Sequence, residues 1–171
     1  MFKGTYHHRI DGKGRLPIPA AFRRALGEDP RFVVTLLDQC LAIYAPSEWA
    51  RLESQLAALP AFSKQVKGLT RLLTSRAADC ELDAQGRVLL PPALREAAAL
   101  GHDAVVVGVL NRIEVWSPDA WDGFVRESER LLDDVSFEVQ WPPAPAPRPD
   151  EMAPPSGTPA RGGRPQPKPK S

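Results

Sequence analysis

Short hydrophobic runs, separated by turns and followed by helical spacings, form the dominant pattern along this chain. Residues 6–10 and 16–18 flank the segment 11–14, whose glycines permit the positive φ values of a tight hairpin turn. After a proline, Phe22 and Leu26 have the four-residue spacing of a short helix, and a glycine follows directly. The pattern therefore predicts a hairpin followed by a short helix.

A second hairpin and a longer helix are predicted next. Runs rich in β-branched and other apolar residues at 32–37 and 41–44 favour two strands. Pro46 suits the first turn of a helix, and Pro60 is expected to end it. Apolar residues at helical spacing in 63–75 predict a further amphipathic helix that leads into the rest of the chain.

The same pattern occurs again 72 residues later. The segment Asp11-Gly-Lys-Gly-Arg15 is matched by Asp83-Ala-Gln-Gly-Arg87, and strands at 104–110 and 113–116 repeat the second hairpin. The fold class is therefore α+β, built from two copies of one unit. We expect a first repeat with its long helix (1–60), a connecting helix (61–75), a second repeat with its long helix (76–135) and a disordered Pro-rich tail (142–171).

The last long helix is expected to begin at Pro118, with Ser117 as its N-cap. An apolar stripe that includes Trp121, Phe124 and Leu131 follows at helical spacing. Single units of this size are marginal on their own. The helical stripes are therefore expected to be buried against each other or against a neighbouring subunit.

Composition agrees with a globular protein that carries a separate tail. Eleven of the 19 prolines lie in residues 142–171, a segment with too few large apolar residues for a core. No apolar run approaches the roughly 20 residues that span a bilayer, and the first residues lack a signal-peptide core. Cys40 and Cys80 have no metal-site or redox spacing and are interpreted as buried thiols. We expect a cytoplasmic protein that does not bind a membrane.

An enzymatic function is not indicated. The glycine-containing turn at 11–15 lacks the Gly-Lys-Ser/Thr ending of a phosphate-binding loop. His7 and His8 are adjacent on a predicted strand, so their side chains point to opposite faces and do not suit a shared metal ion. We therefore expect no catalysis, no cofactor, no metal and no small-molecule substrate.

The two copies differ in charge. Residues 75–101 hold three arginines against four acids, whereas residues 1–27 hold six cations against Asp11 alone. Such a basic surface attracts phosphates, and guanidinium groups on a two-stranded ribbon can bond guanine in the major groove. The candidate DNA-binding residues are Lys3, Arg9, Lys13, Arg15, Arg23 and Arg24.

The turn residues also permit a structural interpretation. In each copy the aspartate can close the turn and the arginine can bridge to it, and we favour this role for Asp83 and Arg87. For the first copy this alternative stays open, although the additional cations favour binding. The candidate turn-structuring residues are Asp11, Gly14, Asp83, Gly86 and Arg87.

At these motifs the chain resembles a known family. A duplicated Asp-x-x-x-Arg turn is similar to AbrB-type swapped-hairpin proteins, and Phe-x-Gly-x-Tyr-His-His-x-Ile-Asp-x-Lys-Gly-Arg-Leu, residues 2–16, closely resembles the MraZ family of bacterial transcriptional regulators. The resemblance covers roughly residues 1–140. It implies tandem SpoVT-AbrB domains that form one pseudo-dimeric barrel with flanking helices.

The resemblance also implies a function. The family represses transcription from promoter direct repeats upstream of the division and cell-wall gene cluster, so double-stranded DNA in the nucleoid is the expected partner and Arg15 the first candidate for base contact. It implies a homo-oligomeric ring, whose repeated basic surfaces would suit direct repeats. The alternative is an oligomeric interaction scaffold or antitoxin-like protein whose basic surface binds an acidic partner.

Overall fold

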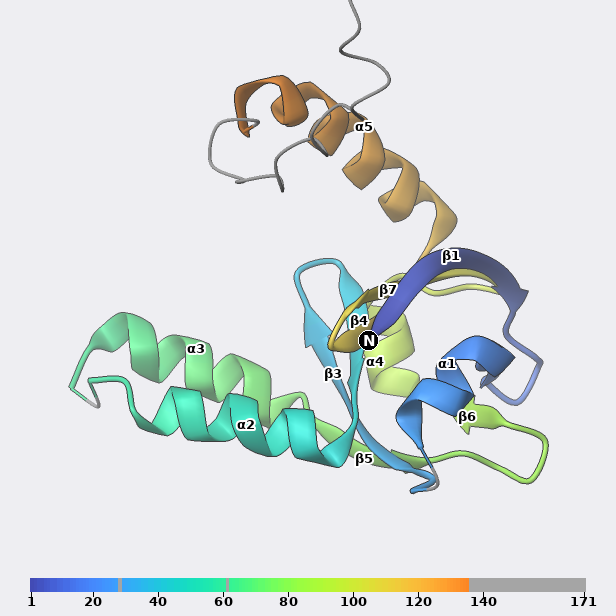
Figure 1. Cartoon of the computed structure of the whole chain (residues 1–171), viewed down its shortest axis with the longest axis horizontal. Coiled ribbons are helices and arrows are strands. Elements are labelled where there is room, and N and C mark those ends of the chain that lie inside the picture. The colour runs from blue at the N-terminus through green and yellow to red at the C-terminus, as the bar shows by residue number, and fades with distance from the viewer. Residues whose placement is uncertain (28, 61, 136–171) are drawn as a thin grey trace, which may run out of the picture. The chain divides into compact units, whose positions relative to one another are not determined.

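The computed structural model describes residues 1–27, 29–60 and 62–135, and Figure 1 shows the arrangement of its elements. The expected tail at 142–171 lies outside the described residues. Within them, the fold is α+β, with a large antiparallel sheet and five helices. In chain order the elements are β1 (Phe2–Arg9), β2 (Arg15–Pro17), α1 (Ala20–Leu26), β3 (Arg31–Leu37), β4 (Cys40–Tyr44), α2 (Pro46–Ala57), α3 (Lys64–Ser75), β5 (Ala78–Glu81), β6 (Arg87–Leu89), α4 (Pro92–Ala97), β7 (Asp103–Leu110), β8 (Arg112–Trp116) and α5 (Pro118–Val135).

Most elements lie where the sequence pattern predicts them. The hairpins β3–β4 and β7–β8 are antiparallel pairs, as expected from their β-branched runs. The Ser63 hydroxyl accepts a hydrogen bond from the Val66 N–H at the start of α3, and Ser117 caps α5 through the N–H of Ala120. Helix α2 ends at Ala57, before the expected stop at Pro60.

The simple hairpin that the local pattern predicts does not pair β1 with β2, because the strands are exchanged between the two repeats, as expected for a swapped-hairpin protein. Strand β1 pairs along its whole length with β7, from Phe2 opposite Leu110 to Arg9 opposite Asp103, and β2 pairs with β6. Turn-forming residues specify the local backbone but not the partner of each flanking strand. The partner is set by burial, because Leu16 of β2 and the opposing Val88 of β6 are both fully buried.

These exchanges relate the two repeats by an approximate two-fold axis. The six-stranded sheet has the order β1-β7-β8-β4-β3-β5, and β2 and β6 form a second sheet. Leu16 pairs with Val88 and Ala42 pairs with Glu114, and the residues of each pair are 72 apart, which is the repeat offset. Each residue on the axis therefore pairs with the residue at the equivalent position of the other repeat.

One face of the large sheet holds the main core. Alternate residues of its strands, such as Val34 and Val106, pack with α1, α4 and the β2–β6 sheet. Phe22 of α1 is buried, as its spacing predicts, and makes edge contacts with Phe2 and Tyr6 of β1 at ring separations of 5.6 and 5.1 Å. This packing fixes β1 and α1, which precede and follow the turn at residues 11–14 in the chain.

The opposite face of the sheet carries the long helices. Helices α2 and α3 lie side by side (Figure 1), and the buried Thr35 hydroxyl of β3 donates a 2.9 Å hydrogen bond to the Leu73 carbonyl of α3. Helix α5 contacts the sheet through Trp121 and Phe124, which pack on Trp116. Farther along α5, Leu131 is 51% exposed, so part of the expected apolar stripe is uncovered in this single chain.

Candidate nucleic-acid interface

The first turn, residues 11–15, is organised around the carboxylate of Asp11. Its Oδ1 accepts hydrogen bonds from the backbone N–H groups of Lys13 and Arg15, both at 2.9 Å, and its Oδ2 accepts from Arg15 Nε at 2.7 Å. The Gly14 N–H donates to the Asp11 carbonyl at 2.8 Å. One side chain thus fixes the turn backbone and also the direction of the arginine that follows it.

These donors lower the pKa of Asp11. The backbone hydrogen bond from Arg15 is the largest cause, and the Arg15 side chain and the Lys13 N–H act in the same direction, against partial desolvation. Together they bring the pKa of this carboxyl down to about 2. The Asp11–Arg15 ion pair is therefore intact at neutral pH.

The second turn has the same geometry. Asp83 accepts hydrogen bonds from the backbone N–H groups of Gln85 and Arg87 at 2.9 Å and from Arg87 Nε at 2.8 Å. The structural role expected for Asp83 and Arg87 is thus visible in their contacts, and the same contacts occur in the first copy. At the tip, Gln85 replaces Lys13, so the two turns differ there in charge.

Strand exchange brings the two turns side by side. The Ile18 N–H donates to the Gly86 carbonyl, and the Leu90 N–H donates to the Gly14 carbonyl, both at 3.0 Å. Arg87 Nη1 also lies 3.8 Å from Asp11 Oδ2, so an arginine of the second repeat approaches the acid of the first. The two Asp-x-x-x-Arg motifs therefore lie next to each other.

Comparison with known proteins identifies the fold family. A family model described as "MraZ protein, putative antitoxin-like" matches the chain twice, over residues 1–72 and 73–136. The chain belongs to the MraZ family. The curated relatives it matches are each named "Transcriptional regulator MraZ".

Three MraZ relatives show the extent of the similarity. The Desulfitobacterium hafniense (strain DSM 10664 / DCB-2) protein is 52% identical over 130 residues, which cover 75% of this chain and 90% of the relative. The Ligilactobacillus salivarius protein is 47% identical over 137 residues, which cover 80% of this chain and 94% of the relative. The Natranaerobius thermophilus protein is 41% identical over 140 residues, covering 81% and 96%.

The structure does not bring all six candidate cations of this MraZ chain together. Lys13 and Arg15 belong to the first turn, and Arg15 remains 31% exposed despite its ion pair. Lys3 and Arg9 lie on the sheet face opposite the main core, Lys3 at the far end of β1 from the turn. Arg9 forms an exposed 3.4 Å ion pair with Asp103.

Arg23 of α1 lies near the second turn rather than the first. A Cβ atom built on Gly86 would lie 2.7 Å from both Cδ and Cζ of Arg23, so this guanidinium group crosses the turn of the other repeat. The neighbouring Arg24 is exposed. Neither forms an ion pair with another residue that the structure describes.

Sequence reasoning did not assign Arg95 to the candidate surface. Arg95 of α4 is the counterpart of Arg23 at the repeat offset, and its side chain crosses the first turn at Gly14. The repeat alignment contained this signal. The position of Arg95 does not follow from the charges within each copy, because strand exchange places Arg23 of α1 and Arg95 of α4 beside the turn of the other repeat.

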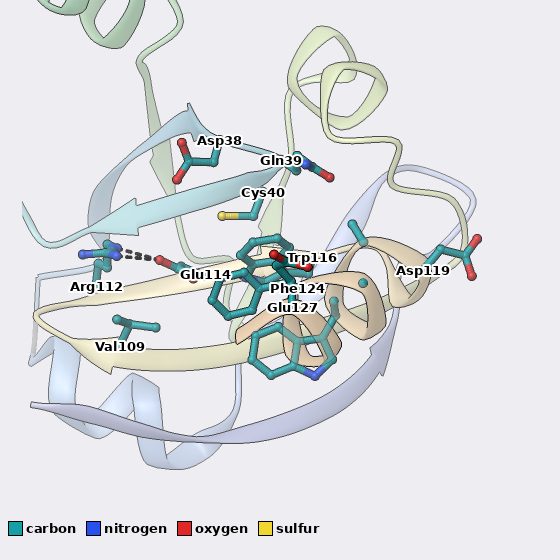
Figure 2. Close-up of a pocket in the computed structure, with 13 residues that line it drawn as sticks. Asp38, Gln39, Cys40, Val109, Arg112, Glu114, Trp116, Asp119, Phe124 and Glu127 are labelled. Atoms are coloured by element: carbon teal, nitrogen blue, oxygen red, sulfur yellow. Dashed lines mark hydrogen bonds and ion pairs between the residues drawn. The ribbon is translucent and has the colours of Figure 1, made fainter. Parts of the chain in front are cut away.

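A groove elsewhere in this MraZ chain has a different character. Figure 2 shows Trp116 and Phe124 beside the Arg112–Glu114 ion pair, in a cavity of about 690 Å³ between the sheet and α5. Burial raises the pKa of the Cys40 thiol at its edge, which disfavours the reactive thiolate. Among the described residues there is no cluster of His, Cys, Asp or Glu suited to a metal ion and no helix able to cross a membrane.

Proposed function

We propose that this chain is a DNA-binding transcriptional regulator that recognises its target sequence through the paired turns. The observation that carries the proposal is the adjacency of two Asp-x-x-x-Arg turns, each with a guanidinium group held by a carboxylate. A guanidinium fixed in this way loses little entropy on forming paired hydrogen bonds to guanine O6 and N7. The names of the relatives support the same function.

Arg15 is the proposed base-reading residue, with Lys13 beside it. The Nε atom of Arg15 bonds Asp11, and among the described residues its two terminal nitrogens have no hydrogen-bond partner. Arg87 is more occupied, because both Nε and Nη2 bond Asp83 at 2.8 Å. The other four candidate cations are proposed as weaker contributors to the electrostatic attraction, namely Arg23, Arg24, Arg9 and Lys3.

We further propose that the chain represses transcription. Its targets would be promoter direct repeats upstream of the division and cell-wall gene cluster, including its own operon, and it would act in the cytoplasm in association with the nucleoid. The two repeats would close into one pseudo-dimeric barrel. The uncovered apolar residues Phe124 and Leu131 favour assembly with further copies. A ring would present its basic surfaces in one direction and gain affinity when several engage adjacent repeats.

A gel-shift experiment tests the proposal. The probe is duplex DNA from upstream of the chain's own operon, and wild type is compared with Arg15→Ala and Arg87→Ala variants that keep the wild-type oligomeric size. We expect Arg15→Ala to abolish the specific shift and Arg87→Ala to weaken it less. A wild-type protein that gives no specific shift even at low salt would contradict the proposal and favour a scaffold or antitoxin-like function.

A further inference from the structure

Arg95 crosses the first turn although it belongs to the second repeat. A Cβ atom built on Gly14 would lie 2.9 Å from Arg95 Cζ and 3.1 Å from both its Nε and its Nη2. Gly14 has a φ of +86°, and because it has no side chain, a neighbouring group can approach its Cα atom closely. The guanidinium plane therefore packs directly against the backbone between Lys13 and Arg15.

The charge of Arg95 is not neutralised within the described structure. Its Nε atom is buried without a hydrogen-bond partner, while the residue as a whole is partly exposed. The described acids form no ion pair with it, in contrast to Arg15 and Arg87, which are both bound by aspartates. A cation held in place without a counter-ion favours an anion from outside the chain.

The exchange changes the distribution of charge between the two turns. Counted by position in space, the first turn has Lys13, Arg15 and Arg95 against Asp11, and the second has Arg87 and Arg23 against Asp83. Both turns are therefore basic. The strong asymmetry seen along the sequence reduces, at the turns themselves, to the replacement of Lys13 by Gln85.

We propose that Arg95 of the second repeat binds a DNA phosphate beside the first turn. This inference rests on the proposed DNA-binding function and adds a residue to it. In this arrangement Arg15 reads a base edge, and Arg95, which packs against the neighbouring Gly14, holds the backbone of the same duplex. Guanidinium groups suit this role because they are weakly hydrated and bind phosphate oxygens in pairs.

Salt-dependent binding of the full chain tests the proposal. Affinity for the upstream duplex and for a scrambled duplex of equal length is measured by fluorescence anisotropy over a NaCl series. We expect Arg95→Gln to weaken both complexes alike and to reduce the slope of log affinity against log salt by about 1, the loss of one phosphate contact. Arg95→Lys keeps the charge and is expected to retain most of the slope.

The matched control is Arg71→Gln, which removes the same charge from the exposed surface of α3. Its slope is expected to equal that of the wild type. The proposal is overturned if Arg95→Gln behaves like Arg71→Gln, or if Arg95→Lys loses as much of the slope as Arg95→Gln, since packing and not charge would then be responsible. If the wild type binds and Arg15→Ala abolishes the specific complex while Arg95→Gln has no effect, only the role of Arg95 fails.

Discussion

Nη1 of Arg87 lies 3.8 Å from Oδ2 of Asp11, although the two residues belong to different repeats. Asp11 already binds Arg15, so its carboxylate connects an arginine from each copy of the motif. This relationship links the two turns electrostatically. A change at either turn should therefore affect the geometry of the other.

Acid should weaken the first turn over a defined pH range. The pKa of Asp11 is lowered to about 2, so its ionised form stabilises the fold above the ordinary pKa of 3.8 and this contribution is lost as the pH falls towards 2. Carbon-13 NMR titration of the Asp11 carboxyl should give a midpoint near 2. The stability difference between wild type and Asp11→Asn should shrink over the same range.

A midpoint close to that of a free aspartate would contradict this prediction. It would mean that the N–H groups of Lys13 and Arg15 do not bind the carboxylate in solution. Asp83 provides an internal comparison, because the Arg87 side chain and backbone lower its pKa by the same kind of contact.

Alanine at Gly14 should destabilise the fold, whereas alanine at Gly12 should not. Gly14 has a positive φ, which strains any residue with a Cβ atom, so we expect a loss of about 2 kcal/mol, while the Arg95 guanidinium that a methyl group would meet can move aside. Gly12 lies in the same turn, but a methyl group there meets no atom within 4 Å. Its substitution should change the free energy of unfolding by less than about 0.5 kcal/mol.

Urea unfolding at a fixed protein concentration measures both variants, since assembly would otherwise change apparent stability. Equal losses at the two glycines would show that general turn flexibility, and not the positive φ of Gly14, determines the effect. Gly14→Ala should also weaken DNA binding, because it displaces Arg95 and the backbone next to Arg15.

The partly buried Arg112–Glu114 pair should matter more to stability than the exposed Arg51–Glu48 pair. Glu114 is 7% exposed and accepts hydrogen bonds from Arg112 at 2.8 Å and from Trp116 Nε1 at 3.1 Å. Arg112→Ala leaves this carboxylate underpaired and should cost about 2 kcal/mol or more. Arg51→Ala, on the exposed surface of α2, should cost less than about 0.5 kcal/mol.

Thermal or urea unfolding of the two arginine variants checks this comparison. The prediction would be contradicted if both alanine variants unfolded at the same midpoint temperature or urea concentration. A small effect of Arg112→Ala alone would indicate that water reaches Glu114 through the groove beside α5.

The elements of this fold were predictable because their signals are local. Pro46 and Ser117 mark the beginnings of helices, and the β-branched runs mark β3 and β7. The Asp11–Arg15 bridge was also predictable, because both residues lie within one turn. Spacing along the chain determines all of these features.

Strand partners and the composition of the basic surface were not predictable in the same way. Nothing near Phe2 specifies that it pairs with Leu110, and nothing near Gly14 specifies that Arg95 crosses it. Both depend on contacts between the two repeats, such as that of Leu16 with Val88, which local sequence signals do not specify. Counting charges within each repeat therefore could not show that Arg23 lies beside the second turn.

The pairing of β1 with β7 has a consequence for synthesis on the ribosome. Phe2–Arg9 is made before its partner strand Asp103–Leu110, which follows about a hundred residues later, roughly 5–20 s at ordinary translation rates. During that interval β1 is an open strand. Charges such as Lys3 and Arg9 on an outward-facing row discourage edge-to-edge pairing of open strands, so we expect these two cations to reduce association with other nascent chains as well.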